Sequence, residues 1–441
     1  MRNALNGARA AIATTVLAGA VFAAAPGTAA ASAAHASRAS RATTPPPATG
    51  YAASDVLGQT TAQGGPSFTT NHHWDGSSTA NALGFSYNQG TVLDTVHHRL
   101  FASDCGDRVM VFNLDANNDI VSRTASNMLG QPDFTHETNR HGQAGLDCAV
   151  GSSYDAAHNR LFVVDDGNNR VMVWDLSHGI TNGMNASWVL GQPDFSTRSA
   201  GTTQSTMDSP YGGSAYDPVH NRFFVADSSN SRVLVWDLGA GISDGMNASY
   251  VIGQPTFLTN ACVDSQSGMD YPYGLAFDPS RQLLFVADSH YSRGTGCTIS
   301  VNEQHRVLIY DLSSGVTSGM NASWELGEPD FTTNSVSSDP KAEIQDPEDL
   351  AYDPVHERLF VQDDSLNREL VFNIGGIHNG EEATAVIGQP DFNTFYYGCS
   401  ATQRDQCDAE GQSDAYDTGN NRLYLSDCLL YTSPSPRDRQ K

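Results

Sequence analysis

The segment Tyr216–Leu238 reads YDPVHNRFFVADSSNSRVLVWDL, and its pattern decides the fold class. It contains two short apolar runs, RFFVA and RVLVW, with the polar residues DSSNS between them. Short runs rich in Val, Phe and Trp that are bounded by Asp, Ser and Asn predict β-strands joined by a tight turn. The segment therefore predicts two neighbouring antiparallel strands.

Related phrases recur along the whole chain. They are LDTVHHRLFASD (93–104), YDAAHNRLFVVDD (154–166), FDPSRQLLFVADS (277–289), YDPVHERLFVQDD (352–364) and YDTGNNRLYLSD (416–427). A second phrase, VLGQPDF (189–195), also has counterparts, in which the residue before Gly is Leu57, Leu129, Ile252, Leu326 or Ile387. A long, regular period of this kind is typical of repeat architectures.

Each full period contains four short apolar runs and no helical stretch. In the second copy these runs are 151–154, 160–164, 170–174 and 187–190. Four antiparallel strands per period predict one blade of a β-propeller. The first copy contributes only DVLGQ (55–59), and the last copy has only its first two strands.

We therefore predict an all-β fold, a six-bladed β-propeller of four-stranded antiparallel blades over residues 55–427. In this prediction the N-terminal strand DVLGQ closes the ring as the outer strand of the sixth blade, because a closed ring leaves no exposed sheet edges. The last blade is truncated and lacks its third strand.

The phrases YDPVHNRFFVADSSNSRVLVWDL and FDPSRQLLFVADS…HRVLIYDL resemble the NHL-repeat family of six-bladed β-propellers, with six copies over 55–427. Blades one and four depart most, and blade four carries the insertion HYSRGTGCTISVNEQ (290–304). The resemblance implies a binding or scaffold module that presents a rigid disc to a protein, peptide or glycan. Related six-bladed folds also host lyases and lactone hydrolases with a metal ion in the central channel, which is the alternative.

Such an enzyme needs histidines or carboxylates that converge from several blades. The sequence shows carboxylates but no matching set of histidines, and no nucleophile with an identifiable base. We therefore expect a binding module rather than an enzyme, although fold alone does not decide between them.

The strand order sorts the connecting loops onto two faces. The turns between second and third strands share one face, here called the top face, with the loops that lead from one blade to the next. The other two sets of turns lie on the bottom face. The longest loops are on the top, so we expect binding through the top face.

All six cysteines before Asp427 fall in top-face loops. Many pairings are possible, but proximity within the repeat favours three disulfides, and an exported protein permits them. These are Cys105–Cys148, Cys262–Cys297 and Cys399–Cys407. A metal site is the alternative.

Residues just before each first strand are expected to surround the upper mouth of the central channel. They are Asp147, Asp208, Tyr211, Asp270, Tyr273, Glu348 and Asp349. Carboxylates and tyrosines in a ring suit a basic group, a sugar, or Ca²⁺ or another divalent cation. The alternative is that Asp holds turns together and Tyr packs between blades. No metal-ligand set is identified.

Two recurring polar motifs are explained by turn chemistry. In VDDGNN (164–169), which resembles a calcium loop without its downstream Glu, we expect Asp165 to accept backbone N–H bonds and Arg170 to begin a strand. Histidines recur in the bottom turns that follow the first strands, at His97, His98, His158, His220 and His356, and we expect turn chemistry to explain them.

The charge and the N-terminus indicate the compartment and exclude some partners. The chain has 49 acidic against 24 basic residues and a net charge of −25, which disfavours nucleic acid and anionic membranes and favours cations or basic partners. Residues 1–36 predict a secretory signal peptide, and 37–54 a Ser/Thr/Pro/Ala-rich linker. We expect no membrane insertion and an extracellular or cell-surface location, in a protein of bacterial type.

The last repeat departs from the pattern after Asp427. The peptide CLLYTSPSPRDRQK (428–441) has neither the turn residues nor the apolar run that should follow. A nucleotide sequence that encodes it resembles the adapter of transposase-based sequencing libraries. We therefore expect residues 428–441 to be a non-native tail produced by read-through.

Overall fold

The computed structural model describes residue 49 and residues 52–68, 73–289, 305–333, 337–395 and 414–425. Its regular structure in these ranges is almost entirely β. The exceptions are short 3-10 turns at His73–Gly76, Asp166–Asn168, Ser228–Asn230, Asp364–Leu366 and Ile374–Gly376. Within these ranges no helix is long and apolar enough to cross a membrane.

Five antiparallel sheets of four strands follow one another along the chain. Blade one consists of β1 (Asn88–Asp94), β2 (Arg99–Asp104), β3 (Arg108–Asn113) and β4 (Asn127–Leu129). Blade two consists of β5 (Ala149–Asp155), β6 (Arg160–Asp165), β7 (Arg170–Asp175) and β8 (Trp188–Leu190). Blade three consists of β9 (Ser214–Asp217), β10 (Arg222–Asp227), β11 (Arg232–Asp237) and β12 (Tyr250–Ile252).

Blade four consists of β13 (Tyr271–Asp278), β14 (Leu283–Ser289), β15 (Arg306–Asp311) and β16 (Trp324–Leu326). Blade five consists of β17 (Pro347–Asp353), β18 (Arg358–Asp363), β19 (Arg368–Asn373) and β20 (Ala385–Ile387). A sixth unit has only two strands, β21 (Ala415–Asp417) and β22 (Arg422–Tyr424).

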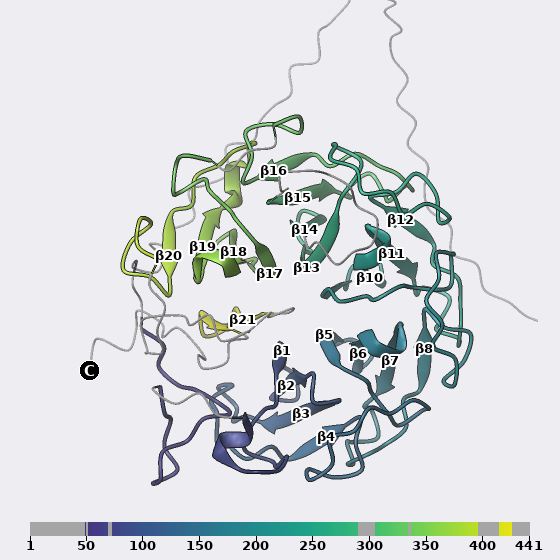
Figure 1. Cartoon of the computed structure of the whole chain (residues 1–441), viewed down its shortest axis with the longest axis vertical. Helices are drawn as coiled ribbons and strands as arrows, with labels where there is room; N and C mark the ends of the chain where they lie inside the picture. The colour runs from purple at the N-terminus through teal and green to yellow at the C-terminus, as the bar shows by residue number, and fades with distance from the viewer. Residues whose placement is uncertain are drawn as a thin grey trace, which may run out of the picture. The chain divides into compact units, whose positions relative to one another are not determined.

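The sheets stand around a central axis as the blades of a β-propeller (Figure 1). The first strand of each blade lies innermost, and the fourth lies at the rim. Each innermost strand contacts the next one around the ring, and β21 contacts both β17 and β1. The predicted all-β propeller is confirmed in this form.

The prediction of six blades, the last one truncated and closed by the N-terminal strand, is wrong, because the described residues form five four-stranded blades and a two-stranded sixth unit. An outer strand needs a third strand as its hydrogen-bonding partner, and the sixth unit ends at β22 in the part of the chain that the structure describes. Residues 55–59, which were expected to close that blade, form no strand beyond a single bridge at Asp55.

The segment 55–59 nevertheless packs much as the outer strands do. Leu57 is buried against a cluster that includes Leu100 of β2 and Tyr424 of β22. Gly58 has φ +83°, close to the +78° of Gly191 after β8, a conformation that favours glycine. A Cβ atom at Gly58 would lie 2.6 Å from the ring of Phe85, so the loop before β1 also packs tightly on this position.

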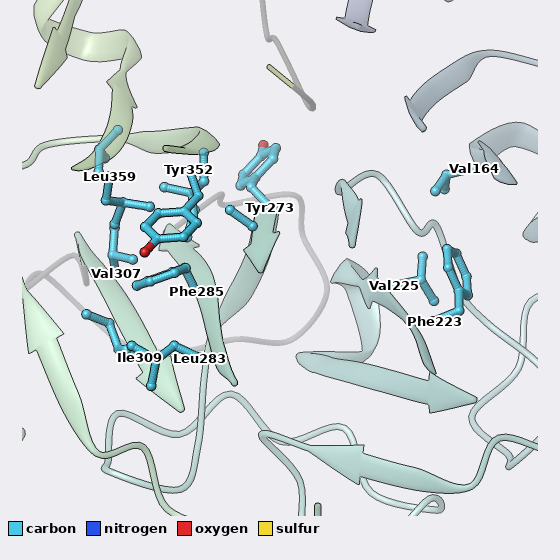
Figure 2. Close-up of a cluster of buried hydrophobic side chains, with 14 of the residues drawn as sticks. Val164, Phe223, Val225, Tyr273, Leu283, Phe285, Val307, Ile309, Tyr352 and Leu359 are labelled. Atoms are coloured by element: carbon cyan, nitrogen blue, oxygen red, sulfur yellow. The ribbon is translucent and has the colours of Figure 1, made fainter. Parts of the chain in front are cut away.

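Apolar residues of the second and third strands fill the space between neighbouring blades. The rings of Phe162 on β6 and Phe223 on β10 stack with centroids 4.5 Å apart. Figure 2 shows Val164 of blade two facing Phe223 and Val225 of blade three, within the largest buried cluster. Since strand residues alternate between the two faces of a blade, each blade packs on both neighbours.

Strand register brings opposite charges together at both ends of each blade. In blade two Arg160 pairs with Asp155 on one side and Asp175 on the other, at the bottom. At the top, Asp165 pairs with Arg170. These positions recur in other blades and create the polar networks described below.

One predicted disulfide is present. Cys105, in the turn after β2, bonds to Cys148, just before β5, with the two sulfurs 1.97 Å apart. This bond joins blades one and two on the top face and confirms that pairing. Cys297, Cys399 and Cys407 lie outside the described residues, so the other two pairings stay predictions.

Candidate functional site

A buried ion pair organises the top of every complete blade. In blade two, Nε of Arg170 donates to Oδ2 of Asp165 at 2.7 Å, and both side chains are fully buried. Arg170 also donates to the carbonyls of Gly145 (3.0 Å) and Phe195 (2.7 Å) in the neighbouring loops. The equivalent pairs are Asp104–Arg108, Asp227–Arg232, Asp288–Arg306 and Asp363–Arg368.

Asp165 also receives the backbone N–H of Asp147 at 2.7 Å, which confirms its expected role. Burial raises the pKa of Asp165 to about 7, although Arg170 and the Asp147 N–H favour its charged form. The pair therefore ties the loop before β5 to the turn after β6.

Three of the predicted rim aspartates donate their backbone N–H to the buried Asp of such an ion pair. The N–H groups of Asp208 and Asp270 donate to Asp227 and Asp288, both at 2.8 Å, as that of Asp147 does to Asp165. The sequence placed these residues on the top face but did not reveal this backbone role. A sequence signal was present, since each of these residues lies 18 or 19 residues before the Asp at or next to the end of the second strand.

The predicted rim tyrosines lie in the core between blades. Tyr211 is 7% exposed and Tyr273 is 1% exposed, and their rings meet edge to face with centroids 6.2 Å apart. Tyr271 packs on Tyr273 at 5.1 Å. These side chains therefore offer little surface to a partner, in line with the packing alternative.

Carboxylates gather on top of the boundary between blades one and two. Asp107, in the turn after β2, accepts the backbone N–H of Cys148 at 2.8 Å. Burial raises the pKa of Asp107 to about 6, and the neighbouring charges of Asp147, Glu137 and Asp104 act in the same direction. This pKa shift indicates a locally negative surface.

A second acidic group lies on top of blade five. Carboxylate oxygens of Asp346, Glu348 and Asp364 all lie within 4.8 Å of one another, close enough to share a cation. Glu348 was predicted as a rim residue, whereas Asp346 and Asp364 were not. The neighbouring Asp349 is fully buried, and burial together with Asp414 raises its pKa well above its ordinary value.

The central channel holds a cavity of about 240 Å³ toward the bottom face. Every innermost strand contributes to its lining, through residues 91–93, 152–154, 214–216, 275–277, 350–352 and 414–416. At corresponding positions it contains Tyr154, Tyr216, Phe277, Tyr352 and Tyr416. Among the described lining residues, Asp414 is the one carboxylate and there is no histidine.

The bottom turns confirm the expected role of the recurring histidines. Nδ1 of His158 lies 2.7 Å from Oδ2 of Asp155, and the same contact occurs at His97, His220 and His356. Each of these Asp residues also accepts backbone N–H bonds within its own turn. The histidines thus close turns, which is a structural role.

The comparisons with known proteins leave the family open. No protein-family model matches this chain, and no curated protein matches it in sequence. The resemblance to NHL repeats therefore stays a prediction, and arguments about function must start from the geometry of the two faces and the channel.

Proposed function

We propose that this protein is an exported β-propeller that binds a positively charged segment of a protein or peptide through its top face. The observation that carries the proposal is the group of Asp107, Glu137 and Asp147, in which the charges of Asp147 and Glu137 add to burial in raising the pKa of Asp107. A Lys or Arg side chain placed there would relieve that repulsion.

The anchoring of the described top loops supports the same function. The buried Asp–Arg pairs and the Cys105–Cys148 bond hold these loops before any partner arrives. A preorganised surface loses less conformational entropy on binding than a mobile one. The disulfide also suits the oxidising compartment that export implies.

The test compares two pairs of neutralising substitutions on opposite faces. Glu137→Gln with Asp147→Asn removes two top-face charges, and Asp175→Asn with Asp237→Asn removes two bottom-face charges. Binding of a fluorescein-labelled oligo-arginine peptide is measured by fluorescence anisotropy at several salt concentrations.

The proposal expects about tenfold weaker binding for the top pair and less than about twofold for the bottom pair. Because both pairs change the net charge equally, equal weakening would mean that the peptide senses only the overall charge. That result would refute a top-face site.

A second candidate function is binding of a divalent cation such as Ca²⁺, favoured by the group Asp346, Glu348 and Asp364. Oxygen ligands at this spacing suit a hard cation. In that case Ca²⁺ raises the melting temperature, EDTA reverses the rise, and Glu348→Gln abolishes it. An unchanged midpoint with and without EDTA, together with no metal in the dialysed protein, would contradict this candidate.

A further inference from the structure

Asp349 on β17 differs from the other fully buried aspartates in its neighbours. In the described part of the chain, every other aspartate that is 0% exposed pairs with an Arg or His side chain, as Asp165 does with Arg170. The charged groups that act on Asp349 are instead two further acids, Asp414 and Glu369. A buried carboxylate without a cation is costly, so something else must compensate its charge.

The other blades have glycine at the position of Asp349. This position lies four residues before the Asp that ends the innermost strand, and its counterparts are Gly90, Gly151, Gly213 and Gly274. A Cβ atom at Gly274 would lie 2.6 Å from Cα of Asp349, and one at Gly151 would lie 2.7 Å from Cα of Gly213. A side chain at this position is therefore directed at the next blade, which for Asp349 is the sixth unit.

Two more polar residues lie on the same face of blade five. Gln362 on β18 and Glu369 on β19 are cross-strand partners, and both are 0% exposed. The corresponding pairs in the other blades are Ser103–Val109, Val164–Val171, Ala226–Val233 and Ala287–Val307. Phe360 and Val371, two residues along the same strands, pack in one cluster with Leu423 of β22, so this face meets the sixth unit. Its upper part is thus polar where other blades carry small or apolar residues.

The carboxyl groups of Asp349 and Asp414 are close enough for a hydrogen bond between them. An ionised carboxylate only accepts hydrogen bonds, so one member of such a pair must carry a proton. The N–H of Leu350 donates to Oδ1 of Asp349 at 2.6 Å, whereas no N–H group of the described residues reaches its Oδ2. The geometry therefore requires a proton between the two acids.

The other elements packed on β17 bring no positive charge to this pair. From β19 the facing group is the acid Glu369, and from β18 it is the neutral Gln362. On the opposite face of β17, β13 contributes Gly274 and β14 contributes the apolar Ala287. Burial is the largest cause that raises the pKa of Asp349, followed by the charge of Asp414, and the N–H of Leu350 opposes them.

We propose that Asp349 and Asp414 form a proton-dependent latch, in which one shared proton holds the sixth unit against blade five and loss of that proton at higher pH loosens the boundary. The latch lies between blade five and the sixth unit, and it does not depend on the proposed top-face function.

The direction of the pH effect follows from the raised pKa of Asp349. Its ordinary value of 3.8 applies to the unfolded chain, and the folded value lies well above it. The latch therefore contributes stability that is fully present below pH 3.8 and is lost as the pH rises through the folded pKa.

The remaining contacts decide which side of the sixth unit loosens. On the side of blade one, Oγ1 of Thr91 donates to the carbonyl of Tyr424 at 3.4 Å. At the bottom of the boundary with blade five, Arg358 donates to Tyr416 at 2.8 Å. Neither contact involves the shared proton, so the upper part of that boundary opens while the rest stays attached. Since Asp414 lines the channel cavity, this opening would widen the cavity wall.

The test is amide hydrogen exchange of the full chain from about pH 5 to about pH 9, with rates corrected for the intrinsic effect of pH. Protection of β21 and β22 is compared with that of β6 and β7 in blade two. One pKa unit corresponds to a tenfold change in an equilibrium, so we expect protection of β21 and β22 to fall at least about tenfold. Protection of blade two should stay constant.

Asp349→Asn provides the decisive variant, because its amide stays neutral and donates to Asp414 at every pH. Protection of β21 and β22 should then stay near the low-pH level of the wild type throughout. Asp349→Gly, which introduces the residue of the other blades, should also remove the pH dependence. If Asp349→Asn does not fold, Asp414→Asn tests the same pair from the other side.

Asp107→Asn is the matched control. It is the same substitution at another carboxyl group with a raised pKa, at the boundary between blades one and two. This variant should keep the wild-type pH dependence of β21 and β22. The proposal is overturned if the wild type shows no such dependence, if Asp349→Asn retains it, or if Asp107→Asn removes it equally.

Discussion

The boundary between blades one and two and the boundary between blades three and four come from the same repeat but are held together differently. The first has the Cys105–Cys148 bond and the links from Arg99 to Tyr154 and Asn159. The second has no such arginine link among the described residues: Nε and Nη1 of Arg222 are buried there without a hydrogen-bond partner, and Phe277 and Gln282 stand at the acceptor positions. Both boundaries retain stacked aromatic rings, Phe101 on Tyr154 and Phe224 on Phe277.

This difference shows which interactions define the ring. Apolar packing between blades is present at both boundaries, so packing is sufficient to set the blade geometry. The polar links vary from one boundary to the next, so we expect them to adjust stability without changing that geometry. The four predictions below test this distinction.

The largest effect is expected from breaking the disulfide. The double substitution Cys105→Ser and Cys148→Ser should lower the free energy of unfolding by about 4 kcal/mol, given a sequence separation of 43 residues. Denaturant unfolding measures this loss. Ser152→Ala, which removes one hydrogen bond to Ser103 at the same boundary, is the control and should cost about 1 kcal/mol.

The second-largest effect is expected from removing the arginine, which should lower the free energy of unfolding by different amounts at the two boundaries. Arg99→Gln leaves the buried Asp94 without its cation and should cost about 3 kcal/mol. Arg222→Gln removes a guanidinium whose Nε and Nη1 have no hydrogen-bond partner among the described residues, so its cost should stay below about 1 kcal/mol. Equal losses in the two variants would show that the apparent difference between the boundaries has no energetic consequence.

Exchanging one hydroxyl should shift the two boundaries in opposite directions. Tyr154→Phe removes an acceptor from Arg99 and should destabilise the protein by about 1 kcal/mol. Phe277→Tyr adds a hydroxyl at the equivalent position of blade four, where Arg222 could use it as an acceptor, and should stabilise the protein by about 0.5 kcal/mol. Thermal unfolding of both variants measures the two shifts, and two shifts of the same sign would contradict the comparison.

The smallest expected effect is a change in how the free energy of unfolding depends on pH. Burial by itself would raise the pKa of Asp94, but the N–H of His97 and the guanidinium of Arg99 outweigh it, so the pKa lies below the ordinary value of 3.8. Asp94 therefore contributes stability that is present above that value and is lost as the pH falls through the lowered pKa.

Unfolding free energies measured from about pH 5 to about pH 2 should fall less steeply in Arg99→Gln than in the wild type. Arg222→Gln should keep the wild-type slope, because its guanidinium bonds to no carboxylate. A wild-type slope in Arg99→Gln would contradict the assigned cause.

Much of the fold could be predicted because each strand is marked by a short apolar run and each turn by polar residues that are close together in sequence. The runs 160–164 and 170–174 became β6 (Arg160–Asp165) and β7 (Arg170–Asp175) with small changes at the ends. The predicted blade count was wrong because ring closure depends on hydrogen bonding between strands that are distant in sequence. The pattern within one repeat does not show which of these strands pair. Gly58 in the segment 55–59 has the same backbone conformation as Gly191 after β8, but the described residues provide no third strand for the segment to pair with.

The candidate site was predictable only in part. Loop position correctly brought Asp147 and Glu348 to the top face, but it did not show that Tyr211 and Tyr273 are covered by neighbouring blades. Asp346 and Asp364 lie 18 residues apart in sequence and come together because β17 and β18 fold back on each other. Similarly, Arg222 looks like every other repeat arginine until the acceptors of the next blade are compared with it.

The contact between the sixth unit and blade one has a consequence for folding speed. Oγ1 of Thr91 on β1 donates to the carbonyl of Tyr424 on β22 at 3.4 Å, across 333 residues of chain. Contacts between distant residues form late, because the entropy of closing so long a loop must first be offset by other contacts. We therefore expect the five complete blades to assemble first and the seam at β21 and β22 to close last. Amide hydrogen exchange should then be fastest there among the strands.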